Sequence, residues 1–163
     1  MGHRRGVESF EDVKGQIGCC GIWCGSCVVG NGALRELTRR YEEIVENYGL
    51  EGWAPDDLDY KEFSRGLSSI QSMPPCQGCL KGGGNPDCQM RVCAVSRGLT
   101  DCNVCDKPEA CGNRERLEGM RTGALGAGLM VKTGKGDGRE VIEAWTEELK
   151  GKWPSSILFD GER

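Results

Sequence analysis

Histidine is almost absent from this sequence, since His3 is its single example in 163 residues. One imidazole in a polar N-terminal segment leaves little for a catalytic base or a histidine-rich metal site. Long apolar runs are also missing, so the sequence predicts no membrane-spanning helix. The opening residues, MGHRRGVESFEDVKG, include no apolar stretch of the signal-peptide kind. We therefore expect a cytoplasmic protein without membrane contact.

Apolar residues are scarce as well, which limits the core that the chain can bury. Leu, Ile, Val and Phe make up about a fifth of the sequence, close to the fraction at which chains have difficulty folding. Glycine, at 26 residues, adds conformational entropy that folding must overcome. Eleven cysteines are present, and they can supply the cross-links that a small core lacks.

Basic residues show no excess that would favour a nucleic-acid partner. The formal net charge is −4, with 21 Lys and Arg against 25 Asp and Glu. The two signs are mixed in RELTRRYEEIVEN, where Glu36–Arg40 and Arg39–Glu43 have the i,i+4 spacing of a solvated helix face. We expect no nucleic-acid interface and an unidentified protein as partner.

The cysteines occur largely in close pairs, which is the spacing that metal sites use. Three C-x2-C pairs are accompanied by five more cysteines: Cys24–Cys27, Cys76–Cys79, Cys102–Cys105, and then Cys19, Cys20, Cys88, Cys93 and Cys111. The cytosol keeps thiols reduced, and an odd number cannot pair completely. Two thiolates three positions apart can grip one ion from a tight turn. Metal ligation is therefore predicted in preference to disulfides.

The spacing also suggests how the cysteines divide among metal ions. The first predicted site is a self-contained set with spacing C-x2-C-x8-C-x4-C: Cys76, Cys79, Cys88 and Cys93. The second takes three ligands from the following cysteines: Cys102, Cys105 and Cys111. Its fourth ligand comes from the N-terminal cluster CCGIWCGSC: Cys20, Cys24 or Cys27. Three thiols are left over in this partition, and they are available for a half-site, a third centre or a reactive pair.

The identity of the metal is not fixed by spacing. Zinc suits closed sites of four thiolates, folds small modules and has no redox chemistry, so we expect two or more zinc ions. An iron–sulfur cluster also takes four thiolates, and it remains the alternative.

Helical periodicity predicts most of the secondary structure. Apolar residues recur at helical spacing, as in Tyr60, Phe63 and Leu67, while strand signals are weak. Capping residues, prolines and glycines bound five predicted helices: 31–49, with Asn31 as its cap, 55–72, 89–97, 113–132 and 137–151.

The predicted fold is mainly α with Cys-rich metal-knuckle loops, a small metal-stabilised helical domain with little β. Three parts are expected: an N-terminal arm over 1–18, a Cys-rich metal-binding domain with two inserted helices over 19–111, and a helical segment over 112–163 that packs on it.

The order of the cysteine motifs resembles a known family. The runs CGIWCGSC, CQGC, CQMRVC and CNVCDKPEAC are similar to the elements of the Cys-rich prokaryotic family called domain of unknown function 3795. The matching positions span about residues 19–111: Cys20, Gly21, Cys24, Cys27, Cys76, Gly78, Cys79, Cys88, Arg91, Cys93, Cys102, Cys105 and Cys111. The resemblance implies a metal-binding, zinc-containing domain and assigns no reaction.

Two further residues are predicted to surround the metal ligands. Arg91 would donate hydrogen bonds to metal-bound sulfur or to a carboxylate, and Trp23 would shield a metal from water. We expect a structural interaction or accessory module rather than an enzyme, because no histidine accompanies the thiols as a base. Two alternatives remain: an iron–sulfur protein serving electron transfer or an anaerobic enzyme, and a reactive, incompletely filled site at Cys19, Cys20, Cys24 and Cys27.

Overall fold

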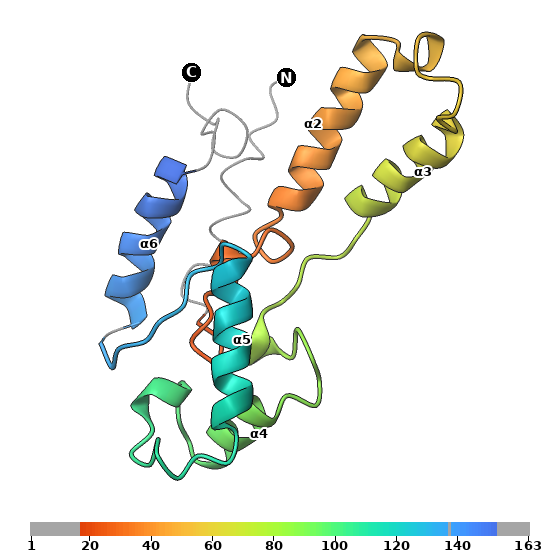
Figure 1. Ribbon diagram of the computed structural model, residues 1–163. Helices are drawn as coiled ribbons and strands as arrows, with labels where there is room; N and C mark the ends of the chain where they lie inside the picture. Colours follow the sequence, from red (N-terminus) through yellow and green to blue (C-terminus); the bar gives the residue numbers. More distant parts are fainter. Residues whose placement is uncertain (1–16, 137, 153–163) are drawn as a thin grey trace.

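The computed structural model describes residues 17–136 and 138–152, and this part of the chain is mainly helical (Figure 1). It contains five α-helices: α2 (Ala33–Asn47), α3 (Tyr60–Gln71), α4 (Gln89–Ser96), α5 (Arg114–Gly126) and α6 (Gly138–Lys152). Short 3-10 turns lie between them: η1 (Cys24–Ser26), η2 (Leu50–Gly52), η3 (Cys79–Lys81) and η4 (Cys102–Val104). The predicted mainly helical, Cys-rich fold with little β is confirmed, because within these ranges β pairing is limited to two isolated bridges. Its stabilisation by metal stays a prediction. The predicted arm lies almost wholly outside the described residues.

Helix α2 begins close to its predicted start. Its cap position is Gly32, with φ of 80°, while the Asn31 side-chain oxygen accepts a 2.9 Å hydrogen bond from the Ala33 amide. Gly49, with φ of 61°, follows the end of the helix as predicted. Both predicted ion pairs, Glu36–Arg40 and Arg39–Glu43, are present on its surface. Surface pairs of this kind contribute about 0.3–0.5 kcal/mol each.

Helix α3 starts five residues later than predicted. The prediction placed its start at Pro55, but residues 55–58 form a turn in which the Leu58 amide donates to the Pro55 carbonyl. The Asp59 side chain accepts a 3.0 Å hydrogen bond from the Glu62 amide. This bond satisfies an amide that the first helical turn leaves without a partner, and it sets the start at Tyr60.

Helices α2 and α3 form a hairpin that projects from the part of the fold holding α4 and α5 (Figure 1). The rings of Tyr41 and Phe63 meet edge-on, with centroids 6.2 Å apart. The apolar side chains of α2 are only partly covered, because Ile44 is 55% exposed and Tyr48 is 74% exposed. Val45 is buried instead.

Helix α5 is shorter than predicted. It ends at Gly126 rather than at residue 132, and Gly128 then adopts a positive φ of 79°. The chain leaves the helix there and runs extended past the first cysteine motif. The Trp23 amide donates to the Met130 carbonyl over 2.9 Å, and the Lys132 amide donates to the Gly21 carbonyl over 2.8 Å. Pairing with a segment about 110 residues away in sequence thus replaces the last helical turns.

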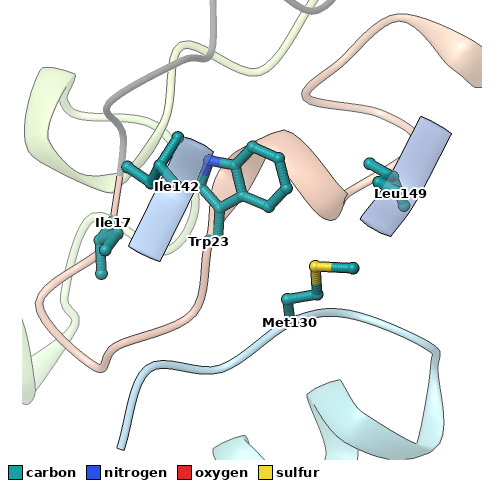
Figure 2. Packing of buried hydrophobic residues seen from close by; sticks show 5 residues of the cluster. All are labelled: Ile17, Trp23, Met130, Ile142 and Leu149. Carbon is teal, nitrogen blue, oxygen red and sulfur yellow. The ribbon is translucent and has the colours of Figure 1, made fainter. Parts of the chain in front are cut away.

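A small apolar core joins the first cysteine motif to α6 (Figure 2). Its buried members are Ile17, Trp23, Met130, Ile142 and Leu149. The half-buried Trp145 packs against them, with its ring 6.0 Å from that of Trp23. Each fully buried aliphatic side chain of this kind contributes about 1.5–3 kcal/mol. This cluster lies beside the first motif, so the other cysteine loops depend on other contacts.

Within the described residues, no helix is long and apolar enough to cross a membrane.

Candidate functional site

All eleven cysteines lie in the described part of the chain, and all are free thiols. Cys19 and Cys20 are buried, and the other nine are partly exposed. The thiols therefore carry no disulfide cross-link, and they remain available as ligands or nucleophiles.

The first motif is shaped by two glycines that have no room for a side chain. Gly21 has φ of +90°, and a Cβ there would lie 2.5 Å from the Lys132 carbonyl oxygen. A Cβ on Gly25 would lie 2.3 Å from the Trp23 indole. The turn η1, which contains Gly25, presents Cys24 and Cys27, with the Cys27 amide donating to the Cys24 carbonyl. The C-G-x-x-C-G-x-C pattern thus follows from the space available at each glycine.

Trp23 and Ser26 connect this motif to the C-terminal part of the chain. Trp23 is fully buried in the apolar core, where its indole N–H has no hydrogen-bond partner among the described residues. The Ser26 hydroxyl donates to the Trp23 carbonyl over 2.7 Å and accepts from the Met130 amide over 2.9 Å. The structure therefore gives Trp23 a packing role, and its predicted role beside a metal stays a prediction.

The second motif, CQGC, wraps closely around its first cysteine. Gly78 has φ of 83°, and the Gly83 amide donates to its carbonyl over 2.8 Å. A Cβ on Gly83 would lie 2.9 Å from the Cys76 sulfur, so the backbone at this position packs directly against the thiol. The Gly-rich run after CQGC is therefore a tight turn built around Cys76.

Arg91 holds that turn in place. Its guanidinium donates to four backbone carbonyls at 2.9–3.0 Å: those of Cys79, Gly83, Asn85 and Pro86. These carbonyls are the acceptors in the structure, and donation to a metal-bound sulfur or a carboxylate stays a prediction. Carbonyls of a loop outside regular secondary structure need donors, and the Arg91 guanidinium supplies them.

Cys24 of the first motif faces the second motif. Burial raises the pKa of the Cys24 thiol, a hydrogen bond from the Cys79 backbone amide lowers it, and nearby Cys76, Cys79 and Cys27 raise it. We call these four residues the N-terminal thiol group: Cys24, Cys27, Cys76 and Cys79. Because Cys27, Cys76 and Cys79 all act on the pKa of Cys24, the two C-x2-C pairs share one neighbourhood.

Cys19 and Cys20 are neighbours of this group and are more deeply buried than its members. Burial raises the pKa of Cys19 to about 12, and a hydrogen bond with the Cys79 thiol adds to the rise. Burial also raises the pKa of Cys20, with Cys79 and Cys88 as its thiol neighbours. The Cys19 carbonyl accepts a 2.7 Å hydrogen bond from the Cys102 amide, which ties the first motif to η4.

Four other cysteines line one cavity of about 430 Å³ between α4, η4 and α5. We call them the cavity thiol group: Cys93, Cys102, Cys105 and Cys111. Burial raises the pKa of Cys102 to about 11, while nearby Arg121 lowers it and Cys111 raises it. The Arg97 guanidinium donates to the Cys105 sulfur over 3.0 Å and to the Asp106 carboxylate over 2.7 Å.

A polar network holds the cavity against the first motif. Arg121 donates to the Cys20 carbonyl and to the Asn103 side-chain oxygen, each over 2.7 Å. Asn103 in turn donates to the Lys132 carbonyl over 2.7 Å. The Lys132 ammonium pairs with the Asp101 carboxylate. Sequence reasoning missed these residues, because each is one of many charged or polar side chains and only the tertiary contacts distinguish it.

The observed grouping differs from the partition predicted from spacing. The prediction joined Cys93 to the second motif, whereas it lines the cavity with Cys102, Cys105 and Cys111. Cys76 and Cys79 instead neighbour Cys24.

Thiols are ligands that zinc and iron favour, so the donor chemistry of both groups fits such metals. The geometry is not that of a closed site, however. In the described residues, no three His, Cys, Asp or Glu side chains form a group that could hold a metal ion. Zinc lies about 2.3 Å from each thiolate, so the thiols must draw together to bind it.

The fold and these groups define a class: small, mainly helical proteins with a minor apolar core, whose loops hold free thiols in groups. Within that class, the chain belongs to the family described as protein of unknown function DUF3795, whose model matches residues 16–116, more than half of the chain. Comparison with curated proteins gave no match, and neither did comparison with solved structures.

Proposed function

We propose that this protein is a cytoplasmic metal-binding module, in which thiolate-bound metal, chiefly zinc, stabilises the loops between the helices and lets the folded chain act as an accessory to a partner protein. One observation carries the proposal. Motif cysteines that lie far apart in sequence, Cys24 with Cys76 and Cys79, share one neighbourhood, and none of them is a member of the apolar core.

Gathering these thiols in one place opposes their ionisation, and a bound metal would offset that cost in free energy. Burial and neighbouring thiols raise the pKa of Cys24, and burial raises that of Cys102, so bringing sulfurs together works against their ionisation. A metal ion reverses this effect, because it binds the thiolate and displaces the proton. Structural zinc contributes about 10 kcal/mol or more to folding, far above the contribution of any contact in these loops.

An enzymatic role has less support. The single histidine, His3, lies outside the described residues, and no other imidazole is available as a base. The proposal therefore assigns the cysteines to ligation and names no catalytic residue.

The test is metal analysis of untagged protein purified without oxygen, before and after a chelator. We expect bound metal, and we expect its removal to abolish the near-UV circular dichroism of Trp23 and Trp145. Cys79→Ala should lower metal content, while Ser69→Ala, on the exposed side of α3, serves as the matched control. A protein that is metal-free as purified, with a melting temperature that a chelator does not change, would contradict the proposal.

A further inference from the structure

A cavity of about 430 Å³ is lined by all four cysteines of the cavity thiol group, together with side chains of α4, α5 and the neighbouring loops. This volume is many times that of one metal ion. The four cysteines come from one continuous segment with the spacing C-x8-C-x2-C-x5-C, starting at Cys93 in α4. No ligand from the first motif is needed to complete a set of four.

We infer that the cavity thiol group binds a polynuclear iron–sulfur cluster, while the N-terminal thiol group binds zinc. The inference rests on the proposed function, because it assumes that the thiols are metal ligands. A zinc ion holds four sulfurs about 2.3 Å from a single centre, which leaves no cavity among them. A cluster places several irons and sulfides inside a cage of four thiolates, so it needs an open volume between them.

The charges around the cavity suit such a cluster. Four thiolates and a cluster together carry net negative charge, and four cationic side chains line the cavity against two acidic ones: Arg97, Arg114, Arg121 and Lys135, against Glu109 and Glu118. Arg97 already donates to the Cys105 sulfur over 3.0 Å. Hydrogen bonds to sulfur and solvent exposure are two features through which a protein sets a cluster's reduction potential.

Binding requires each of the four thiols to lose its proton to solvent as its sulfur bonds to iron. Arg97 donates to the Cys105 sulfur over 3.0 Å, and Arg121 lines the same cavity as Cys102, so two of the four ligand positions have a guanidinium in the surrounding wall. We assign Arg97 and Arg121 as positioning residues for these ligands.

The test uses full-length protein reconstituted under argon with ferric iron, inorganic sulfide and excess thiol as the reductant. Iron, acid-labile sulfide, zinc and the visible spectrum are measured on wild type, Cys111→Ser and Cys76→Ser. We expect iron and sulfide in equal amounts with brown absorbance in wild type. Cys111→Ser should lose at least tenfold of the iron and keep its zinc, and Cys76→Ser should do the reverse.

A second variant keeps all four thiols and so does not depend on the folding of Cys111→Ser. Arg97→Gln removes the hydrogen bond to the Cys105 sulfur, and we expect the midpoint potential of the cluster to become more negative. Arg65→Gln, at an exposed pair on α3, should leave the potential unchanged.

Two results separate this inference from the proposed function. If wild type takes up zinc and no iron with sulfide, and Cys111→Ser loses zinc, the cluster inference fails and the metal-binding proposal stands. If wild type binds neither metal, the proposed function itself fails.

Discussion

The Lys132 ammonium nitrogen lies 2.8 Å from the Asp101 carboxylate, and each side chain is 6% exposed. The other carboxylate oxygen of Asp101 accepts from the Asn103 amide over 2.8 Å. The backbone of Lys132 pairs with Gly21 in the first motif. This buried ion pair therefore joins three parts of the site: the segment after α5, the turn η4 and the first cysteine loop.

Replacing Lys132 should be among the most damaging single changes in the described chain. Lys132→Ala leaves the Asp101 carboxylate buried without its cation, which costs about 3–5 kcal/mol in comparable pairs. Urea unfolding of the purified protein measures this loss. The control is Arg65→Ala, which breaks the exposed pair with Glu62 and should cost less than about 1 kcal/mol. Equal losses of unfolding free energy in the two variants would contradict the larger contribution expected from the buried pair.

Two glycine substitutions should change stability in opposite directions. Gly25→Ala places a methyl group 2.3 Å from the Trp23 indole, and overpacking of this kind costs about 1–3 kcal/mol. Gly123→Ala lies in α5 with no atom within 4 Å of the added methyl group, so it should stabilise the helix by about 0.5–1 kcal/mol. Thermal melts of both variants measure the difference. The packing described for the first motif is wrong if Gly25→Ala melts like wild type.

Substitutions of different cysteines should differ in their effect on metal content and stability, because the cysteines occupy different positions in the site. Cys79→Ala should remove bound metal and lower the melting temperature, because Cys79 belongs to the N-terminal thiol group. Cys19→Ala should retain the metal and cost about 1 kcal/mol, because Cys19 is a buried thiol hydrogen-bonded to Cys79 and outside the family motif. Metal analysis combined with calorimetry distinguishes them. Loss of metal in Cys19→Ala would make Cys19 a ligand and overturn this assignment.

The buried Cys19 thiol should make the free energy of unfolding depend on pH. Burial raises its pKa from 9.0 to about 12, so the folded chain holds this proton more tightly than the unfolded chain. The stabilisation is complete below pH 9.0 and is lost as pH rises towards 12, because the unfolded chain releases the proton first. Urea unfolding of wild type should therefore show falling stability over that range, with a smaller fall in Cys19→Ala. Parallel profiles for the two proteins would contradict the burial of this thiol.

Local signals in the sequence predicted the helices well and their ends less well. Asn31 and Gly49 lie close to the two ends of α2, because such signals depend on neighbouring residues, although Gly32 rather than Asn31 holds the cap position. For α3, Pro55 and Asp59 are both acceptable starts, and the bond between Asp59 and the Glu62 amide decides between them. The early end of α5 follows from pairing with the first motif, which no local pattern in the sequence indicates.

The cysteine motifs were identified from spacing, but their grouping was not. Spacing along the chain favours neighbours in sequence, and it joined Cys93 to Cys76 and Cys79. In the structure, the turn held by Arg91 brings Cys76 and Cys79 to the first motif, while α4 directs Cys93 into the cavity. These are tertiary contacts, so a single sequence does not reveal them.

The most direct test of the central claim is X-ray absorption at the metal edge of the untagged protein purified without oxygen. Thiolate ligation predicts a shell of sulfur atoms about 2.3 Å from the metal, with no nitrogen shell. A nitrogen or oxygen shell at about 2.0–2.2 Å, or the absence of bound metal, would contradict the claim that these cysteines hold metal in the folded protein.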